Sequence, residues 1–174
     1  MDPLGLPEGE LYLLEYQPQW PRLFEEEAER IRLACGGQLI GIEHIGSTAV
    51  PGLAAKPILD IMPLLVGFEE GLDTVPGMEA LGYEFKGEYG IPRRHYFVKG
   101  WPRTHHVHMY EADDEEVVRH LLFRDYLREH AETAAEYEAL KRRLVADVSR
   151  EAYPDGKTAF VEEMLARANY ESPS

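Results

Sequence analysis

The sequence predicts an α/β (α+β) protein, with a mixed β-sheet flanked by helices and a C-terminal helical lobe. The almost unbroken apolar run from Pro57 to Val66 is typical of a central strand that is buried on both faces. Further β-like segments lie before and after this run, between residues 39 and 110. From Asp113 onward the apolar spacing becomes helical as far as residue 168.

The length of 174 residues suits one domain that can bury a core. We expect a single domain over residues 1–174, with an α/β core at about 11–112 and C-terminal helices at 113–168. No run of about 18 apolar residues occurs, and the first ten residues lack a signal-peptide pattern. Cys35 is the sole cysteine. We therefore expect a cytoplasmic protein without membrane attachment, in which Cys35 is a buried small hydrophobe.

The net charge of −14 argues against general nucleic-acid binding, which requires a basic surface. The charge is uneven, however. Between Lys86 and His108 the chain has two Lys, three Arg and four His, against the single acid Glu88. This basic segment is consistent with a local pocket for a small anion and equally with a solvated hairpin face.

The first half of the chain alternates β-like and helical segments. The expected elements, in chain order, are a β-leaning run at Leu11–Tyr16, a helix from Trp20 to Cys35, a strand at Leu39–Gly46, a loop or short helix at Ser47–Lys56 and the central strand at Pro57–Val66. Pro21 suits the first helical position, and Gly36 and Gly37 end the helix. Pro63 predicts a bend or bulge within the central strand.

The second half contains three further strands and then only helices. The expected elements are a helical stretch at Phe68–Leu81 interrupted at Pro76-Gly77, strands at Tyr83–Lys86, His95–Lys99 and His105–Tyr110, and helices at about Asp114–Glu129, Glu132–Ser149 and Lys157–Ala168. On the first of these long helices, Val118, Leu121 and Leu122 are expected on the apolar face. On the second, Lys141, Arg142 and Arg143 have the pattern of a solvated face.

The most informative segment joins the strand at Leu39–Gly46 to the central strand. Gly46 allows close approach of a ligand to the backbone, and the hydroxyls of Ser47 and Thr48 could receive phosphate oxygens. Lys56 could add a positive charge. Asp60 follows thirteen residues after Ser47 within an apolar strand, where a carboxylate is costly to bury without a partner or a metal. Asp60 could therefore hold a divalent metal, or cap the nearby loop as a structural carboxylate.

Three motifs in this order resemble the signature of the GrpB family. They are the stretch from Glu43 to Ile61, the His106-Val107-His108 strand, and the helical run from Leu121 to Arg128. The resemblance covers about Leu11 to Ala168. It implies the nucleotidyltransferase superfamily, with a polymerase-β-like fold. In that superfamily a Gly-Ser pair binds a nucleotide triphosphate, two acids in a D-x-D or D-x-E pattern hold Mg²⁺, and a later strand supplies a third acid.

Carried onto this sequence, the resemblance matches Gly46 and Ser47 to the Gly-Ser pair and Asp60 to the first, catalytic acid. The second acid is replaced by Met62. The strand expected to supply the third acid offers His106 and His108, which share one face by strand alternation. Imidazole suits Zn, Ni or Fe better than Mg. The site is then either a changed metal centre or a binding site that has lost nucleotidyl transfer, unless the histidines make only structural hydrogen bonds.

Other side chains are candidates for the same site. His44 is expected to share a face with Gly46 and could join Asp60 and the two histidines around a metal. Arg93 and Arg94 could neutralise the charge of a phosphate. Arg124 and Arg128 lie one helical turn apart and favour ion pairs with neighbouring acids.

The leading functional hypothesis is binding of a nucleotide or other small phosphorylated ligand at the Gly-Ser turn, with metal-assisted nucleotidyl or group transfer as its extension. The divalent metal would be Mg, or a histidine-preferring ion such as Zn or Ni. The alternative is a non-catalytic accessory or folding module, related to the domain fused to dephospho-CoA kinase in some bacteria. Whether the chain turns over a substrate stays open, and homo-oligomerisation is compatible with both hypotheses.

Overall fold

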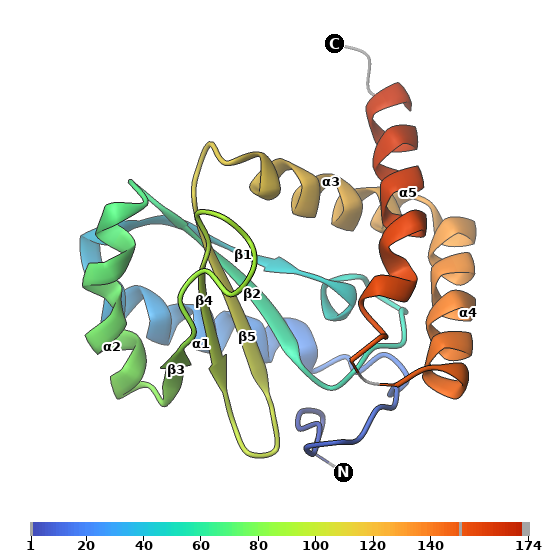
Figure 1. The fold of residues 1–174 in the computed structure, drawn as a ribbon, viewed down its shortest axis with the longest axis horizontal. Coiled ribbons are helices and arrows are strands. Elements are labelled where there is room, and N and C mark those ends of the chain that lie inside the picture. The colour runs from blue at the N-terminus through green and yellow to red at the C-terminus, as the bar shows by residue number, and fades with distance from the viewer. Residues whose placement is uncertain (1, 150, 172–174) are drawn as a thin grey trace.

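A mixed β-sheet forms the centre of the protein. The computed structural model describes residues 2–149 and 151–171. Within these residues five strands form one sheet in the order β1-β2-β5-β4-β3, with only β2 and β5 parallel (Figure 1). The strands are β1 (Leu39–Ile45), β2 (Leu59–Leu65), β3 (Tyr83–Phe85), β4 (His95–Lys99) and β5 (His105–Glu111).

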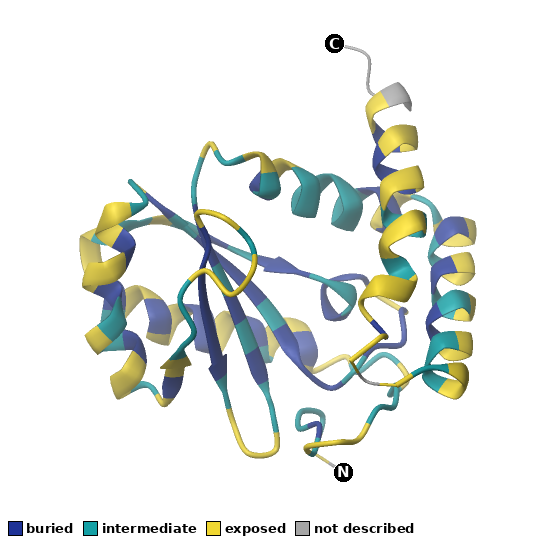
Figure 2. Cartoon of the chain, in the orientation of Figure 1, coloured by how far each residue is buried: buried dark blue, intermediate teal, exposed yellow. Residues whose placement is uncertain are grey.

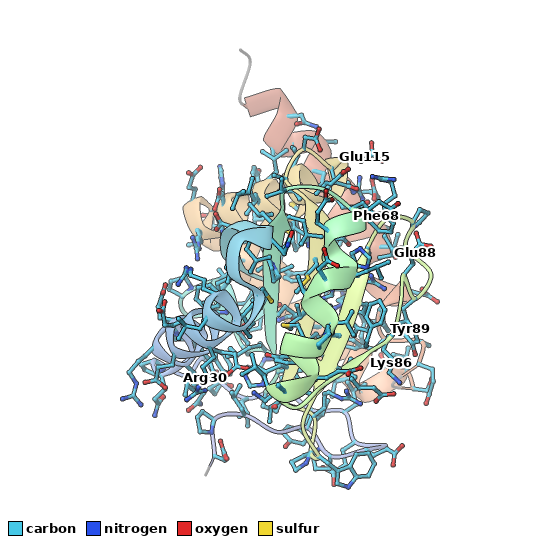
Figure 3. The ribbon with its side chains drawn as sticks, turned by 90° about the vertical axis from the view of Figure 1, so that its left-hand side faces the viewer. Arg30, Phe68, Lys86, Glu88, Tyr89 and Glu115 are labelled. Carbon is cyan, nitrogen blue, oxygen red and sulfur yellow. The ribbon has the colours of Figure 1, made fainter. Side chains whose placement is uncertain are left out.

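Helices cover this sheet and extend beyond one end of it. The α-helices are α1 (Trp20–Cys35), α2 (Val75–Ala80), α3 (Glu115–Glu129), α4 (Ala131–Asp147) and α5 (Thr158–Glu171), with short 3₁₀ turns η1 (Gly36–Gln38), η2 (Ser47–Ala49), η3 (Glu69–Thr74) and η4 (Asp155–Lys157). Figure 3 shows α1, with Arg30, on one side of the sheet and the loop carrying Glu88 and Tyr89 on the other. The last three helices form the C-terminal lobe at the right of Figure 1.

Helix α1 follows directly from its sequence. Pro21 stands in its first turn, and Gly36 ends it with a φ of 58°. The residues at helical spacing from Trp20 to Cys35 are buried against β1, β2, β4 and β5, in a core that includes Ile61, Phe97 and Val107. This core occupies the face of the sheet opposite Asp60, because alternate residues of each strand point to opposite faces.

The second face is covered only in part. Ile45, Met62 and Tyr110 form a smaller apolar cluster on it, against Val117 of α3. The strands are mostly buried, whereas the loop in front of them is mostly exposed (Figure 2). The remainder of this face is open beside Asp60, where α3 and the C-terminal helices form a wall.

The structure confirms the predicted mixed sheet and the C-terminal helices, with differences in five places. Leu11–Tyr16 is not a strand, since it makes one isolated bridge, from Leu14 to Ala55. Pro63 causes no register shift; the irregularity lies between Leu39 and Gly41 on the neighbouring strand. The pairing of β2 with β5 also keeps the same offset before and after Pro63.

The helical stretch after β2 is indeed in two pieces, but the boundary falls between Thr74 and Val75 rather than at Pro76-Gly77. Pro76 lies in the first turn of α2, where it lacks only an amide that a helix leaves unpaired. On α3, Val118 is 54% exposed, whereas Val117 packs on the sheet. The expected solvated face of α4 is wrong at Lys141, which is 1% exposed.

Within the described ranges, no helix has both the length and the apolar character that crossing a lipid bilayer requires.

A buried carboxylate ties α1 to the far strands. Glu27 is 2% exposed and accepts hydrogen bonds from Tyr83 Oη and Lys99 Nζ, both at 2.7 Å, and from Arg30 Nη1 at 2.9 Å. Burial alone would raise the pKa of Glu27. The bonds from Lys99 and Tyr83 outweigh burial and lower the pKa to about 2.

We expect Glu27→Gln to lower the free energy of unfolding at pH 7 by about 3 kcal/mol, because it leaves the Lys99 ammonium without its counter-charge. The folded pKa lies below the unfolded value, so this stabilisation is complete above about pH 4.5 and is lost as the pH falls towards 2. Urea unfolding at several pH values measures the difference. Glu25→Gln, an exposed neighbour, is the control. An equal acid sensitivity in Glu27→Gln and wild type would contradict the assignment.

Candidate functional site

Strand pairing brings the proposed metal ligands together. In the parallel register Asp60 of β2 lies beside His106 of β5, and His108 follows on the same face. Asp60 Oδ1 is 3.0 Å from His108 Nε2 and 3.6 Å from His106 Nδ1. One potential ligand atom from each of the three residues lies within 4.8 Å of the other two. Two imidazoles and one carboxylate thus converge on one point.

The protonation states suit such a centre. Burial opposes ionisation of Asp60, but the hydrogen bonds and charges of His106 and His108 hold its pKa well below its usual range. Burial, the largest influence on His106, lowers the pKa of that imidazole. A carboxylate beside a neutral imidazole presents lone pairs to a cation.

Arg94 fixes the orientation of His108. Arg94 Nη1 donates to His108 Nδ1 at 3.4 Å, so the ring proton of His108 lies on Nε2 and is donated to Asp60. Arg94 is itself held by the carbonyl oxygens of Glu88 and Tyr89. A metal bound at Nε2 would move the ring proton to Nδ1 and end the Arg94 contact.

The Gly46–Ser47 turn is fitted against the carboxylate. Gly46 has a φ of 73° and a ψ of −173°, a conformation open almost only to glycine. A Cβ at this position would lie 2.8 Å from Asp60 Oδ2. The glycine is therefore required both by its backbone conformation and by the close approach of Asp60.

A small cationic pocket lies next to this turn. It has a volume of about 100 Å³, and its described lining includes Gly46, Ser47 and Asp60 together with three lysines, Lys56, Lys141 and Lys157. We call it the lysine pocket. Lys141 Nζ donates to Ser47 Oγ at 2.9 Å and to the carbonyl oxygen of Ala54.

The aromatic ring of Tyr153 lies between the other two lysines. Lys157 Nζ and Lys56 Nζ are 4.5 and 5.0 Å from the centre of this ring. Burial, followed by the charge of neighbouring lysines, lowers the pKa of Lys141 to about 7 and that of Lys157 to about 8. Three lysines and one carboxylate, that of Asp60, therefore line a small space, and a bound anion would offset the excess of positive charge.

The structure does not bring every predicted residue to this site. His44 lies on the opposite face of the sheet from Asp60, where its ring stacks on Phe24 at 4.7 Å and its Nε2 is 2.9 Å from Thr48 Oγ1. Its pKa is lowered to about 4 by burial. Thr48 lines the lysine pocket, but it is 2% exposed and its hydroxyl is engaged with His44.

The two arginines of the hairpin also separate. Arg93 Nη2 binds Glu111 Oε2 at 2.8 Å, and its guanidinium lies 4.7 Å from the ring centre of Phe68. Arg93 is thereby held away from Asp60. Arg94 contacts His108 and lines the groove beside Asp60. On α3, Arg124 and Arg128 have the predicted structural role: both contact Asp125, and Arg124 also binds Glu43.

Several residues that line the site are not predicted from the sequence. The missed contributors are Tyr137, Lys141, Tyr153 and Lys157, all from the C-terminal lobe. The position of Lys141 could have been predicted from helical spacing, because it is four residues from Tyr137 and therefore on the same helical face as that buried ring. Tyr153 and Lys157 lie around a turn, where no periodic pattern indicates burial.

Met62 explains why the position of the second acid cannot serve a metal here. Its side chain is 0% exposed and packs with Ile45, Tyr110 and Val117 under α3. A carboxylate at this position would be buried among apolar groups. The donor set of the described residues therefore fits a single nitrogen- and oxygen-coordinated ion, such as Zn²⁺, and does not fit a pair of Mg²⁺ ions held by carboxylates.

Comparison with known proteins places the chain among bacterial relatives. The family model described as "GrpB protein" matches residues 10–167. UPF0157 protein YqkA of Bacillus subtilis is 43% identical over 157 residues, covering 90% of this chain and 44% of that protein. A UPF0157 protein of Pseudomonas aeruginosa is 46% identical over 165 residues, covering 90% of this chain and 66% of its own length. The chain thus spans less than half of YqkA.

A shorter match involves an enzyme. Dephospho-CoA kinase of Mycobacterium tuberculosis is 31% identical over 74 residues, which cover 41% of this chain and 18% of the kinase.

Solved structures agree on the fold. The conserved protein GrpB from Enterococcus faecalis matches with a TM-score of 0.82 and 41% identity, covering 90% of this chain and 96% of that one. Cid1 poly(U) polymerase matches with a TM-score of 0.55 and 14% identity, covering 75% of this chain and 44% of that one. At this identity the second match establishes only the nucleotidyltransferase-like fold.

The contact between Gly46 and Asp60 can be tested by adding one methyl group. Gly46→Ala and Gly52→Ala both place alanine at positive φ, but a Cβ at Gly52 meets nothing within 4 Å. We expect Gly52→Ala to lower the free energy of unfolding by about 1 kcal/mol through backbone strain, and Gly46→Ala to cost at least about 1 kcal/mol more. Urea denaturation measures both. Equal costs would show that the approach of Asp60 imposes no constraint.

Proposed function

The chain belongs to the GrpB family, and from this premise we propose that it binds a nucleotide or another phosphorylated ligand at the Gly46–Ser47 turn. Asp60 is the proposed catalytic residue if the bound group is transferred. The observation that carries the proposal is the lysine pocket, since three cationic side chains surround the turn that the family resemblance assigns to phosphate.

The charge distribution supports an anionic ligand. The protein as a whole carries a net charge of −14, yet Lys56, Lys141 and Lys157 lie together around one small space. Moving ammonium groups out of water and beside one another is unfavourable, and a phosphate would add negative charge beyond that of the Asp60 carboxylate in the same lining. If no ligand bound at this place, uncharged side chains would stabilise the fold more than lysines do.

Each residue has a distinct role in this proposal. The Gly46 backbone and the Ser47 hydroxyl hold phosphate oxygens, and the lysines neutralise their charge. Lys141, already bonded to Ser47 at 2.9 Å, also fixes the hydroxyl that faces the ligand. Arg94 orients His108 rather than contacting phosphate. Arg93 and His44, by their positions, have no direct role.

The metal would be held by Asp60, His106 and His108. A bound ion would supply Lewis-acid polarisation of a phosphoryl oxygen. Two imidazole ligands favour an ion such as Zn²⁺ or Ni²⁺ over Mg²⁺. To bind through Nε2, His108 would shift its ring proton to Nδ1 and give up its hydrogen bond from Arg94. The nucleotide class is suggested by Cid1, which has been crystallised with MgGTP and with the UTP analogue UMPNPP.

A second candidate is a non-catalytic accessory module. Two observations favour it: the match to part of dephospho-CoA kinase and the burial of Met62 in place of a metal-binding acid. On this hypothesis the lobe and its pocket would serve binding or folding without turnover. A cytoplasmic location and self-association stay predictions from the sequence under either candidate.

The lysine pocket predicts stabilisation by polyanions. At a tenfold excess over its Kd, pyrophosphate should raise the Tm by about 3–6 °C. Lys141→Met should abolish this shift without lowering the stability of the free protein, because it removes a buried charge. Arg142→Met, on the exposed side of α4, is the matched control and should keep the full shift. Differential scanning fluorimetry with pyrophosphate, nucleotides and dephospho-CoA makes the measurement. A flat panel in wild type would contradict the phosphate site and favour the accessory module.

The metal centre predicts one bound ion per chain. After incubation with Zn²⁺ and desalting, wild type should retain about one equivalent, and His106→Ala/His108→Ala should retain none. His130→Ala, at the end of α3 outside the cluster, should bind as wild type does. Elemental analysis by mass spectrometry gives the stoichiometry. Equal metal contents in the wild type and the double variant would exclude these histidines as ligands.

A further inference from the structure

A larger groove continues from the lysine pocket past Asp60. It has a volume of about 480 Å³ and lies between the sheet, α3 and α5. The residues that line both spaces are Gly46, Asp60, Phe123, Tyr137 and Lys157. The pocket and the groove are therefore adjacent and share part of their lining, with Gly46 and Asp60 at their common border.

The chemistry of the groove differs from that of the pocket. Its described walls are largely apolar, with Ile45 and Ile91 on the sheet side and Val161 and Leu165 on α5. The ring of Phe123 stands edge-on to Tyr137, at 5.2 Å between centres and an angle of 87°. The ring of His120 lies on the same wall, with its centre 6.2 Å from that of Tyr110.

The charged residues at the groove are engaged with one another or with the backbone. Arg119 pairs with Glu162 and lies 3.5 Å from Glu116. Arg94 donates to the carbonyls of Glu88 and Tyr89 and to His108. Lys157 lies at the end that opens into the lysine pocket. The cavity thus has an anion-binding end and an apolar end.

We propose that the groove binds the uncharged aromatic body of the ligand whose phosphate lies in the lysine pocket. This inference rests on the proposed function and deepens it, because it defines the ligand as a phosphate ester of an aromatic-ring compound. The ester linkage would lie beside Asp60, at the junction of the two spaces.

Size and shape agree with this assignment. Pockets for small organic molecules have volumes of about 300–1,000 Å³, so the groove is large enough for a ring system, whereas the lysine pocket suits a phosphate-sized group. Aromatic rings pack favourably edge-on or offset against other rings, and Phe123, Tyr137 and His120 offer such partners. Apart from Lys157 at the border with the lysine pocket, the charged side chains of the described groove walls are paired, which favours a body that is itself uncharged.

The test compares two probes on ¹⁵N,¹³C-methyl-labelled protein by NMR titration: inorganic phosphate and 1-naphthyl phosphate. We expect naphthyl phosphate to bind about tenfold more tightly, because the ring is removed from water. Both probes should shift the signals of Ser47, and only naphthyl phosphate should shift the methyl signals of Ile91, Val161 and Leu165.

A matched pair of substitutions locates the ring. Val161→Trp fills the groove and should abolish the tenfold preference while leaving the affinity for inorganic phosphate unchanged. Val118→Trp makes the same change at an exposed position of α3 and should keep the preference. Should Val161→Trp fail to fold, the methyl shifts of wild type still decide the question.

The outcomes separate the two proposals. If inorganic phosphate binds at Ser47 but naphthyl phosphate binds no more tightly and leaves the groove methyl signals unchanged, the groove proposal is overturned and the phosphate site stands. A naphthyl preference retained in Val161→Trp likewise overturns it. If neither probe perturbs Ser47, both the proposed function and this inference fail.

Discussion

The carboxylate of Asp60 lies on an otherwise apolar central strand, and the surrounding structure is arranged to accommodate its charge. The parallel pairing of β2 with β5 places His106 beside it, and His108 donates to it at 3.0 Å. On the β1 side, only a glycine fits, since a Cβ on Gly46 would lie 2.8 Å from Oδ2. The hydrogen bonds compensate for burial and keep the carboxylate ionised. The turn that follows Gly46 is therefore fixed by the same residue that would carry the chemistry.

The C-terminal lobe supplies the side chains that complete the site on the sheet. Helix α3 seals part of the sheet face over Met62, and α4 and the turn before α5 bring lysines to the open part. Burying Lys141 works against stability, because its pKa is lowered to about 7 by desolvation and by neighbouring lysines. A lysine whose burial lowers the stability of the fold is more readily explained by a ligand than by packing. In the proposed function the lobe would supply counter-charge for a ligand, whereas the sheet supplies the acid and the imidazoles.

Glu27, on the opposite face of the sheet, is a buried charge whose compensation differs from that of Lys141. Its carboxylate receives hydrogen bonds from Tyr83, Lys99 and Arg30, so its charge is balanced within the protein itself. Among the described residues, no acid forms an ion pair with Lys141; its hydrogen bonds go to Ser47 Oγ and to the Ala54 carbonyl. The difference marks the lysine pocket as the place where an external anion would have the larger effect.

The sequence by itself determined the local features. The strands, the ends of α1, the Gly-Ser turn and the shared face of His106 and His108 follow from apolar periodicity, from proline and glycine positions, and from strand alternation. The family motifs added the nucleotidyltransferase-like fold. Only the tertiary structure decided which side chains meet. His44 was placed on the wrong face because the strand ends before Gly46, and the positive φ of that glycine breaks the alternation. Lys141 and Lys157 could not be assigned to the site because their approach to Ser47 depends on how the C-terminal helices dock, which local patterns do not encode.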